Sequence, residues 1–286
     1  MVFQINQELC IQCGQCLPDC PGFAIQYDSE ANRYAILTGR CNSCSHCACI
    51  CPMNAVEDGT GLPFAEWENP KFDPDATHAF LAGKRSVRQF HAKEVPREVL
   101  EQMIAVGEMT STSSNAQDWH ATILLSADKK NLVVHNVQKM ESLICGFVQN
   151  RAGRALAKLV PEGRTYLQDP DISEKLHGLA ESLKTGEDGV FYNAPAVVVL
   201  STDKGSAMGG TNCVLAAAAM MYDLQARGIG SCYIGFAQIA LNRSKRLRTQ
   251  IGIPPNDKVH VVFALGYSKV KYRRLPHRQK MPVNFI

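Results

Sequence analysis

From about residue 78 onward, the chain alternates between helix-like and strand-like patterns of apolar and polar residues. Residues 96–107 open with a proline and place apolar side chains at mainly helical spacing, which predicts a helix. Apolar runs at 119–127, 194–201 and 259–265 predict strands. The run at 194–201 is continuous, which is typical of a strand that is buried on both faces.

Residues 211–226 form a long apolar segment that Gly228 ends. Apolar side chains, many of them alanine, cover most of its helical circumference, which predicts a central helix with close contacts on several sides. Residues 62–77 contain three prolines and predict a connection, with Thr77 as the cap of a short helix that runs to Gly83. No segment approaches eighteen consecutive apolar residues, so we expect no membrane span.

The first 51 residues have a different character, because they contain nine of the twelve cysteines of the chain. Eight of the nine form the pattern C-x2-C-x2-C-x3-C-P twice, and each position of the second copy lies 31 residues after its counterpart. The first copy is Cys10, Cys13, Cys16 and Cys20, and the second is Cys41, Cys44, Cys47 and Cys51. An internal repeat of this kind predicts two structurally equivalent sites.

This spacing is typical of [4Fe–4S] clusters, in which three cysteines of a run hold one cluster and the fourth reaches across to the other. We therefore predict one cluster on Cys10, Cys13, Cys16 and Cys51, and the other on Cys41, Cys44, Cys47 and Cys20. A zinc ribbon, the first alternative, would leave one cysteine of each run idle. A disulfide framework, the second, would need an oxidising compartment, whereas residues 1–10 lack both the charged and the apolar region of a secretion signal.

Residues 1–60 resemble the bacterial two-cluster ferredoxins, and the repeated cysteine pattern carries this resemblance. Cys49 lies outside the pattern. We expect it to be a small buried residue beside the cluster loop, with a spare ligand as the alternative. Cys145, Cys213 and Cys232 have apolar or small neighbours in sequence and are expected in the core.

Charge differs between the two parts of the chain. Residues 1–62 carry a net charge of −4 and the remaining residues one of +7, so that the whole chain carries +3. This imbalance is too mild and scattered to suggest nucleic-acid binding, but it would suit a cofactor phosphate. Among the basic residues, we expect a solvated helix face from Arg243, Lys245, Arg246 and Arg248.

Four short segments of the second part together suggest a site for a flat heterocycle with a phosphate group. Residues 84–88 concentrate cations and a hydroxyl, which suit phosphate and carbonyl oxygens. The polar segment 112–119 offers amides and hydroxyls for the edge of a heterocycle, and the glycines of segment 228–235 allow close approach to a ring system. The basic segment 271–276 offers a second phosphate clamp, although each segment alone would more often be an ordinary turn or terminus.

In order and separation, these segments resemble the nitroreductase-like flavoprotein family over residues 78–286. The resemblance implies an α+β fold in which helices surround a mostly antiparallel central sheet. It also implies an obligate homodimer with two FMN sites at the subunit interface, each built from both chains. Ser111 and Asp118 stand where the family more often has proline, and Gly235 stands where some members have glutamate.

The same resemblance implies which residues contact FMN. The ribityl, phosphate and pyrimidine groups would be held by Lys84, Arg85, Ser86 and Arg88. The partner subunit would contribute Thr112, Ser113, Asn115 and Gln117. The flavin N5 edge would lie near Ile234 and Gly235, with a backbone N–H as donor, and the phosphate would be covered by Lys271, Arg273 and Arg274.

An iron–sulfur cluster carries one electron at a time, whereas a flavin accepts single electrons and releases a pair. We therefore predict an FMN- and iron–sulfur-dependent oxidoreductase in which single electrons pass through both clusters to FMN. The donor would be external and of low potential, such as ferredoxin, and the substrate a small nitroaromatic, quinone or activated alkene. The alternatives are a nitroreductase-like flavoenzyme that NAD(P)H reduces directly, and a non-catalytic electron-transfer module of a larger complex.

We expect this enzyme in the cytoplasm of an anaerobic or microaerophilic cell. The predicted domains are an iron–sulfur domain at residues 1–62, a linker at 63–77 and an FMN domain at 78–286. No catalytic residue can be named from the sequence. The residues over the open face of the flavin are expected between positions 138 and 188, where the pattern is helical and has no motif.

Overall fold

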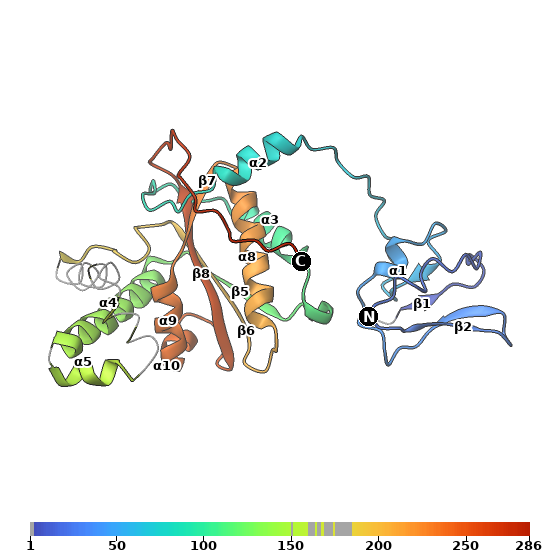
Figure 1. The fold of residues 1–286 in the computed structure, drawn as a ribbon, viewed down its shortest axis with the longest axis horizontal. Helices are drawn as coiled ribbons and strands as arrows, with labels where there is room; N and C mark the ends of the chain where they lie inside the picture. Colours follow the sequence, from blue (N-terminus) through green and yellow to red (C-terminus); the bar gives the residue numbers. More distant parts are fainter. Residues whose placement is uncertain (1–2, 150, 160–163, 165–166, 169–173, 175–184) are drawn as a thin grey trace. The chain divides into compact units, whose positions relative to one another are not determined.

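The computed structural model describes residues 3–149, 151–159, 164, 167–168, 174 and 185–286 (Figure 1). The chain forms two compact units. The first unit is Met1–Asp73 together with Ser111–Gln117, and the second is Pro74–Thr110 together with Asp118–Ile286. Much of the segment 138–188, where residues over the flavin were expected, lies outside the described residues.

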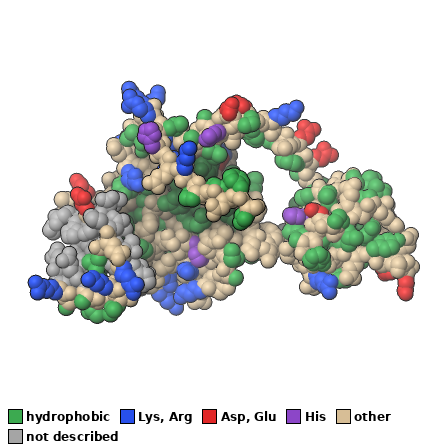
Figure 2. Space-filling model, viewed as in Figure 1, with side chains coloured by type: hydrophobic (Ala, Val, Ile, Leu, Met, Phe, Trp, Pro, Cys, Tyr) green, Lys and Arg blue, Asp and Glu red, His purple; other side chains and the backbone are tan. Residues whose placement is uncertain are grey.

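The first unit contains two small antiparallel sheets. Strand β1 (Gln4–Ile5) pairs with β4 (Val56–Glu57), and β2 (Ile25–Asp28) pairs with β3 (Arg33–Ile36). A short helix, α1 (His46–Cys49), lies between β3 and β4 in the chain. Figure 2 shows that hydrophobic side chains cover much of the visible face of this unit, where few charged ones lie. The small core and this exposed apolar surface are as expected for a unit too short to bury a large core.

The 31-residue repeat is visible in the backbone of the first unit. Each sheet joins one strand from each copy, because Ile5 pairs with Val56, and their repeat counterparts Ile36 and Ile25 pair with each other. Left-handed backbone conformations also recur at equivalent positions, namely Gln12 and Ser43, Gly14 and Ser45, and Phe23 and Asn54. The two copies therefore have similar backbone conformations, and exchanging one copy for the other maps each small sheet onto the other.

The second unit is built on a four-stranded antiparallel sheet with the strand order β5-β6-β8-β7. The strands are β5 (Trp119–Leu124), β6 (Ala196–Asp203), β8 (Asp257–Tyr267) and β7 (Ile229–Tyr233). All three pairings are antiparallel. The predicted strands at 119–127, 194–201 and 259–265 are thus confirmed, and so is the α+β class with a mostly antiparallel sheet. Strand β7 was not predicted.

Helices cover both faces of this sheet (Figure 1). On one face lie α3 (Arg97–Glu108) and α8 (Gly209–Ala226), which are the helices predicted at 96–107 and 211–226. On the other face lie α4 (Ala127–Gln149), α9 (Gly235–Arg243) and α10 (Lys245–Gln250), and α5 (Arg151–Ala157) packs against α4. Helix α2 (Pro74–Ala82) begins three residues before the predicted cap Thr77, because proline is favoured in a first helical turn.

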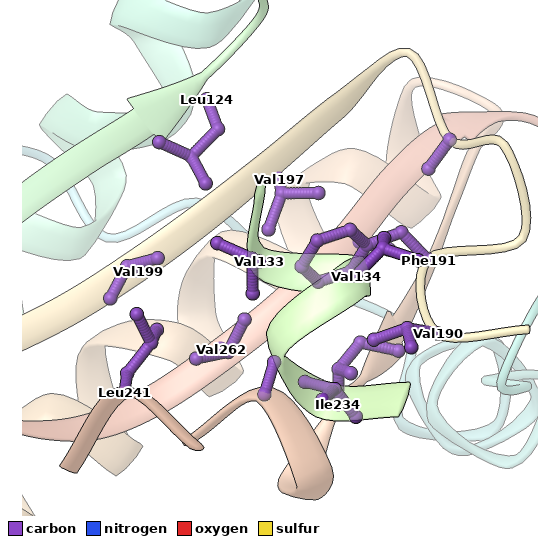
Figure 3. Close-up of a cluster of buried hydrophobic side chains, with 14 of the residues drawn as sticks. Leu124, Val133, Val134, Val190, Phe191, Val197, Val199, Ile234, Leu241 and Val262 are labelled. Atoms are coloured by element: carbon purple, nitrogen blue, oxygen red, sulfur yellow. The ribbon is translucent and has the colours of Figure 1, made fainter. Parts of the chain in front are cut away.

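Strand β6 supplies side chains to two separate cores. Val197 and Val199 join the cluster that contains α4 and α9, whereas Val198 and Leu200 join the cluster that contains α3 and α8. All four are at most 1% exposed. Figure 3 shows the first cluster, in which side chains of α4, β6 and β8, among them Val133, Val197 and Val262, gather together. Burial of β6 on both faces, as its continuous apolar run predicted, is confirmed, and each such side chain contributes roughly 1.5–3 kcal/mol.

Two predictions about individual side chains are wrong. Arg248 is only 3% exposed, and its Nη1 donates to the carbonyl oxygens of Leu241 at 2.7 Å and Asn242 at 3.2 Å. These carbonyls lie at the end of α9, where helical partners run out, and the buried guanidinium adds to the bond that Leu241 accepts from the N–H of Ser244 at 3.4 Å. Cys49 is exposed rather than buried, because the neighbouring Cys47 and Ala48 occupy the inward positions of α1.

The remaining cysteines behave as expected where they are described. Cys213 and Cys232 are 0% and 2% exposed and belong to the two cores of the second unit. The side chain of Cys145 lies outside the described residues. Within the described ranges, no helix combines the length with the apolar character that crossing a bilayer requires.

Candidate functional site

Two small cavities in the first unit divide eight of its cysteines into two sets of four. One cavity, the first cysteine site, is lined by Cys10, Cys13, Cys16 and Cys51. The other, the second cysteine site, is lined by Cys20, Cys41, Cys44 and Cys47. The fold thus brings together the two crossed sets that the spacing suggested, since the last cysteine of each run crosses to the other site.

The electrostatics of both sites oppose four free thiolates. Burial raises the pKa of Cys16, and the neighbouring Cys10, Cys13 and Cys51 raise it further. Burial likewise raises the pKa of Cys47 to about 11, with further contributions from Cys41, Cys44 and Cys16. Thiolates are the form that binds metal, so such a set needs a positively charged group at its centre, which iron supplies.

Backbone N–H groups are arranged to support the cysteines that cross between the sites. The N–H of Ala24 donates to Cys20 Sγ at 3.2 Å, and the N–H of Ala55 donates to Cys51 Sγ at 3.3 Å. These two contacts are repeat counterparts of each other. Hydrogen bonds to cluster sulfurs help to set the reduction potential of such centres. Cys49 lines neither cavity.

The loop at Ser111–Gln117, which was expected to contact FMN, belongs to the first unit. Asn115 Nδ2 donates to the carbonyl oxygens of Asn42 at 3.2 Å and Ser43 at 2.9 Å, and it thereby contacts the loop between Cys41 and Cys44. Gln117 Nε2 donates to Asn115 Oδ1 at 2.8 Å, and the backbone N–H of Gln117 donates to Thr112 Oγ1 at 3.1 Å.

The second unit contains a cavity of about 490 Å³, here called the cationic cavity. Its lining comes from the segment after α2, from the middle of α8, from the end of β7 and from the C-terminal segment. The lining residues are Lys84, Arg85, Ser86, Arg88, Ala218, Met221, Tyr222, Tyr233, Tyr272, Pro276 and Arg278. The first four are the residues that the family resemblance assigned to FMN.

The segment at 84–88 is fixed to the edge of the sheet. The N–H of Val87 donates to the carbonyl oxygen of Ser231 at 3.1 Å, and Ser86 forms a parallel bridge with Ser231. Gly230 permits this approach, because a Cβ there would lie 2.6 Å from Val87 Cγ2. Buried and exposed side chains alternate along this segment. Val87 is buried, and its neighbours Ser86 and Arg88 are exposed at the cavity.

Two of the four predicted residues are occupied with backbone groups. Lys84 Nζ donates to the carbonyl oxygens of Arg85 at 3.0 Å and Ser231 at 3.3 Å, and burial lowers its pKa. Arg85 Nη1 donates to the carbonyl oxygens of Ala82 at 2.7 Å and Lys84 at 2.6 Å. Their positive charges still face the cavity, but these hydrogen bonds organise the loop itself.

Arg88 is hydrogen-bonded to the phenol of Tyr192. Burial raises the pKa of Tyr192, and the positive charge of Arg88 opposes this shift. Tyr192 follows a tight turn in which Asp188 Oδ1 accepts from the N–H groups of Val190 at 3.0 Å and Phe191 at 2.7 Å. The guanidinium is therefore oriented by the loop that leads into β6.

The C-terminal segment crosses the cavity with a different set of residues from those predicted. The cavity is lined by Tyr272, Pro276 and Arg278, whereas the expected Lys271 and Arg273 are exposed and do not line it. Arg274 contributes only its carbonyl oxygen, which accepts from Arg85 Nη2 at 3.5 Å. The lining residues are all at even positions, and the period of two in an extended chain would have separated them from their odd-numbered neighbours.

Sequence reasoning missed the apolar and aromatic wall of the cavity. Ala218, Met221 and Tyr222 lie one helical turn apart on α8 and present one face, and Tyr233 ends β7. Burial raises the pKa of Tyr233, with a further contribution from Tyr222. Flat aromatic and thioether surfaces of this kind suit a ring system. The spacing of 218, 221 and 222 was the available signal.

The two predicted backbone donors after β7 differ. The N–H of Ile234 donates to the carbonyl oxygen of Val262 at 2.8 Å and is therefore engaged in the sheet. Gly235 is the first residue of α9, where an N–H has no acceptor within the helix. Of the pair, only Gly235 can offer a donor to a ligand.

The comparisons with known proteins divide the chain in the same way as the motifs. A model of the nitroreductase family matches residues 81–267, and a model of the 4Fe-4S binding domain matches residues 3–26. The nitroreductase NfnB of Mycolicibacterium smegmatis is 24% identical over 207 residues, which is 68% of this chain and 83% of that protein. Ferredoxin-1 of Chlorobaculum tepidum is 35% identical over 65 residues, which is 21% of this chain and 100% of that protein.

Solved structures show the same fold for the second part. A nitroreductase with bound FMN from Bacteroides fragilis superposes with a TM-score of 0.53 at 20% identity, over 72% of this chain and 98% of that one. An iodotyrosine deiodinase bound to FMN and 3-iodo-L-tyrosine gives a TM-score of 0.51 at 16% identity, over 72% and 97% of the two chains. At these identities the likeness is one of fold.

Proposed function

Because this chain belongs to the nitroreductase family and carries a ferredoxin-type domain at its N-terminus, we propose that it is an FMN- and iron–sulfur-dependent oxidoreductase. In this proposal, the cysteine-rich domain passes single electrons to the FMN domain, which reduces a small organic substrate. One observation carries the proposal: a single chain contains two four-cysteine sites and a cationic cavity on a nitroreductase fold.

The lining of the cationic cavity fits FMN. Its volume of about 490 Å³ is within the range of small-molecule and cofactor sites. Arg88 and Arg278 offer guanidinium groups to a phosphate, and Ser86 adds a hydroxyl. Tyr222 and Met221 offer a flat apolar wall. Arg85 and Lys84 hold the segment at 84–88 in place through hydrogen bonds to backbone carbonyls.

The two cysteine sites fit [4Fe–4S] clusters, each with four cysteines from both copies of the repeat. When bound, clusters supply electrons one at a time, and FMN supplies the change from single to paired electron transfer. Three cysteines of one run would hold each cluster, and the fourth cysteine, from the other run, would tie the two copies together. The amides of Ala24 and Ala55 fix Cys20 and Cys51 in that arrangement.

The proposal extends to partners that the geometry alone does not name. We propose a homodimer, a low-potential donor such as ferredoxin, and a nitroaromatic, quinone or activated alkene as substrate. We also propose domains at residues 1–62 and 78–286, joined by a linker at 63–77, and a cytoplasmic location. A second candidate function is direct reduction of FMN by NAD(P)H, because the nitroreductase part of this chain covers 98% of a solved nitroreductase with bound FMN.

Anaerobic rapid mixing of the FMN-loaded protein with reduced ferredoxin, NADH or NADPH tests the proposal. We expect reduced ferredoxin to bleach the flavin absorbance rapidly, and we expect Cys13→Ser and Cys44→Ser to abolish this route. Cys49→Ser is the matched control, since Cys49 is exposed and lines neither cysteine site. Full ferredoxin-driven reduction in the Cys13 and Cys44 variants would contradict the relay, and rapid bleaching by NAD(P)H alone would support the second candidate.

A further inference from the structure

The two cysteine sites are equivalent in backbone but differ in the residues around the cysteines. The first site is lined by Ile11, Gly14 and Gln15, where the second site has their repeat counterparts Asn42, Ser45 and His46. One pair of repeat counterparts has the opposite polarity, because Tyr34, which carries a hydroxyl, lines the first site and Phe3 lines the second. The second site therefore has the more polar lining.

Among the residues described as lining the two sites, a permanent positive charge is present at the second site alone. Arg40 lines the second site and directly precedes Cys41. Its repeat counterpart is Leu9, an apolar residue that directly precedes Cys10. An arginine side chain stays protonated over the whole working range of pH, so this difference between the sites does not depend on pH.

Negative charges are more evenly divided. Asp19 directly precedes Cys20 of the second site, but it does not line the cavity, and its Oδ2 lies 3.7 Å from His46 Nδ1. Glu8 lies two residues before Cys10 of the first site and does not line that cavity either. Glu57 directly follows the lining residue Val56 of the first site, whereas its repeat counterpart Gln26 is neutral, so the carboxylates do not cancel the difference that Arg40 and the polar lining make.

Reduction adds one negative charge to a cluster, so nearby cations and polar groups stabilise the reduced form and raise the reduction potential. We propose that Arg40 and the polar lining give the cluster of the second cysteine site the higher potential of the two. One electron then passes from the reduced first cluster to the oxidised second cluster, with no bond made or broken. This inference rests on the clusters of the proposed function but not on the flavin or its substrate.

A redox titration of the full-length, cofactor-loaded protein, followed by electron paramagnetic resonance of the reduced clusters, tests the inference. We expect the first added electron to favour one cluster by at least about tenfold, which corresponds to about 59 mV. Arg40→Leu installs the residue of the first site and should lower the upper potential towards the lower one. Leu9→Arg makes the reverse exchange and should raise the lower potential.

Arg33→Leu is the matched control, because it removes an equal charge from an exposed strand position that lines neither site. Iron and sulfide contents verify that each variant holds both clusters. If Arg40→Leu fails this check, Arg40→Lys, which should keep the upper potential, and Leu9→Arg still decide the matter. Equal potentials in the unmodified protein, or equal shifts in the Arg40→Leu and Arg33→Leu variants, would overturn the inference.

The outcome is separable from that of the proposed function. Unequal potentials without ferredoxin-driven flavin reduction would leave this inference intact and remove the relay. Equal potentials with rapid flavin reduction would remove this inference and leave the relay.

Discussion

Individual side chains of the C-terminal segment differ sharply in what they face. Arg278 lines the cationic cavity, whereas Lys271 is exposed and does not line it. A hydrogen bond to a charged group contributes roughly 1.5–3 kcal/mol. We therefore expect Arg278→Ala to weaken FMN binding about 10- to 100-fold and Lys271→Ala to change it little, as measured by titrating FMN into the apoprotein and following flavin fluorescence. A larger effect from Lys271→Ala would restore the assignment made from the sequence.

Glu141 of α4 is a buried carboxyl that should make stability depend on pH. It is 2% exposed, and among the described residues its Oε2 has no hydrogen-bond partner. Burial raises its pKa to about 7, an effect that the charge of Arg243 only partly opposes. A glutamate in the unfolded chain has a pKa of about 4.3, so the folded state holds the proton more tightly between these values.

The sign of the effect follows from this difference. The stability that the protonated Glu141 provides is fully present below about pH 4 and is lost as pH rises through about 7. We expect Glu141→Gln to be more stable than the unmodified protein by about 3 kcal/mol at pH 8 and nearly equal to it in acid. Chemical denaturation followed by circular dichroism at several pH values measures this, with the exposed Glu101→Gln as control. Parallel stability curves for the Glu141 variant and the unmodified protein would contradict the expectation.

Residue types alone could not have predicted several of these details. The eight repeat cysteines were identifiable because spacing along the chain fixes which of them share a site. Arg248 was expected in solvent because its neighbours in sequence are charged, yet the end of α9 supplies carbonyls that only the folded chain brings near it. Tyr222 and Tyr233 are ordinary aromatic residues until α8 and β7 pack side by side.

At the level of elements, the contact between β7 and the segment at 84–88 positions the cationic cavity. Gly230 faces Val87 so closely that an added Cβ would lie 2.6 Å from Cγ2 and 2.8 Å from Cβ of Val87. A short β-branched side chain cannot move aside, so Gly230→Ala should push Ser86 and Arg88 away from the cavity. We expect a loss of roughly 1–3 kcal/mol in unfolding free energy together with weaker FMN binding.

Gly210→Ala is the control for this change. Gly210 lies in α8, and the nearest atom to an added Cβ would be His260 Nδ1 at 3.4 Å. Alanine is favoured over glycine within a helix by about 1 kcal/mol, so this variant should be neutral or slightly stabilised. Denaturation and FMN titration of both variants give the comparison. Unchanged FMN affinity in Gly230→Ala would show that the contact with β7 does not position the binding segment.

The predictability of the elements followed the strength of their apolar patterns. Strand β6 and helix α8 were predicted because their apolar runs differ in length and composition, one being short and rich in valine and the other long and rich in alanine. Strand β7 was missed because it is short and contains a glycine and a serine, so its assignment depends on pairing with β8. The start of α2 was displaced because proline was interpreted as part of a connection instead of a first helical turn.

For the whole molecule, the sequence predicted the joining of two kinds of domain, because each carries its own local motifs. What local motifs cannot decide is whether residues of two chains share a site. The family resemblance implies that Asn115 contributes to the FMN site of the partner subunit, whereas within one chain its side chain contacts the loop between Cys41 and Cys44. Arg88 lines the cationic cavity. The two residues therefore provide a test of how the site is assembled.

A mixed dimer of Arg88→Ala and Asn115→Ala chains performs this test. If each FMN site takes Arg88 from one chain and Asn115 from the other, the mixed dimer has one intact site and one site with both defects. It should then bind about half the FMN of the unmodified dimer, while either variant alone binds little. If both residues serve the site of their own chain, every site carries one defect and mixing restores nothing. Differently tagged chains, co-expressed and purified over both tags, supply the mixed species for flavin quantification. Light scattering should give twice the 31.4 kDa of one chain, and a mass of one chain would exclude shared sites altogether.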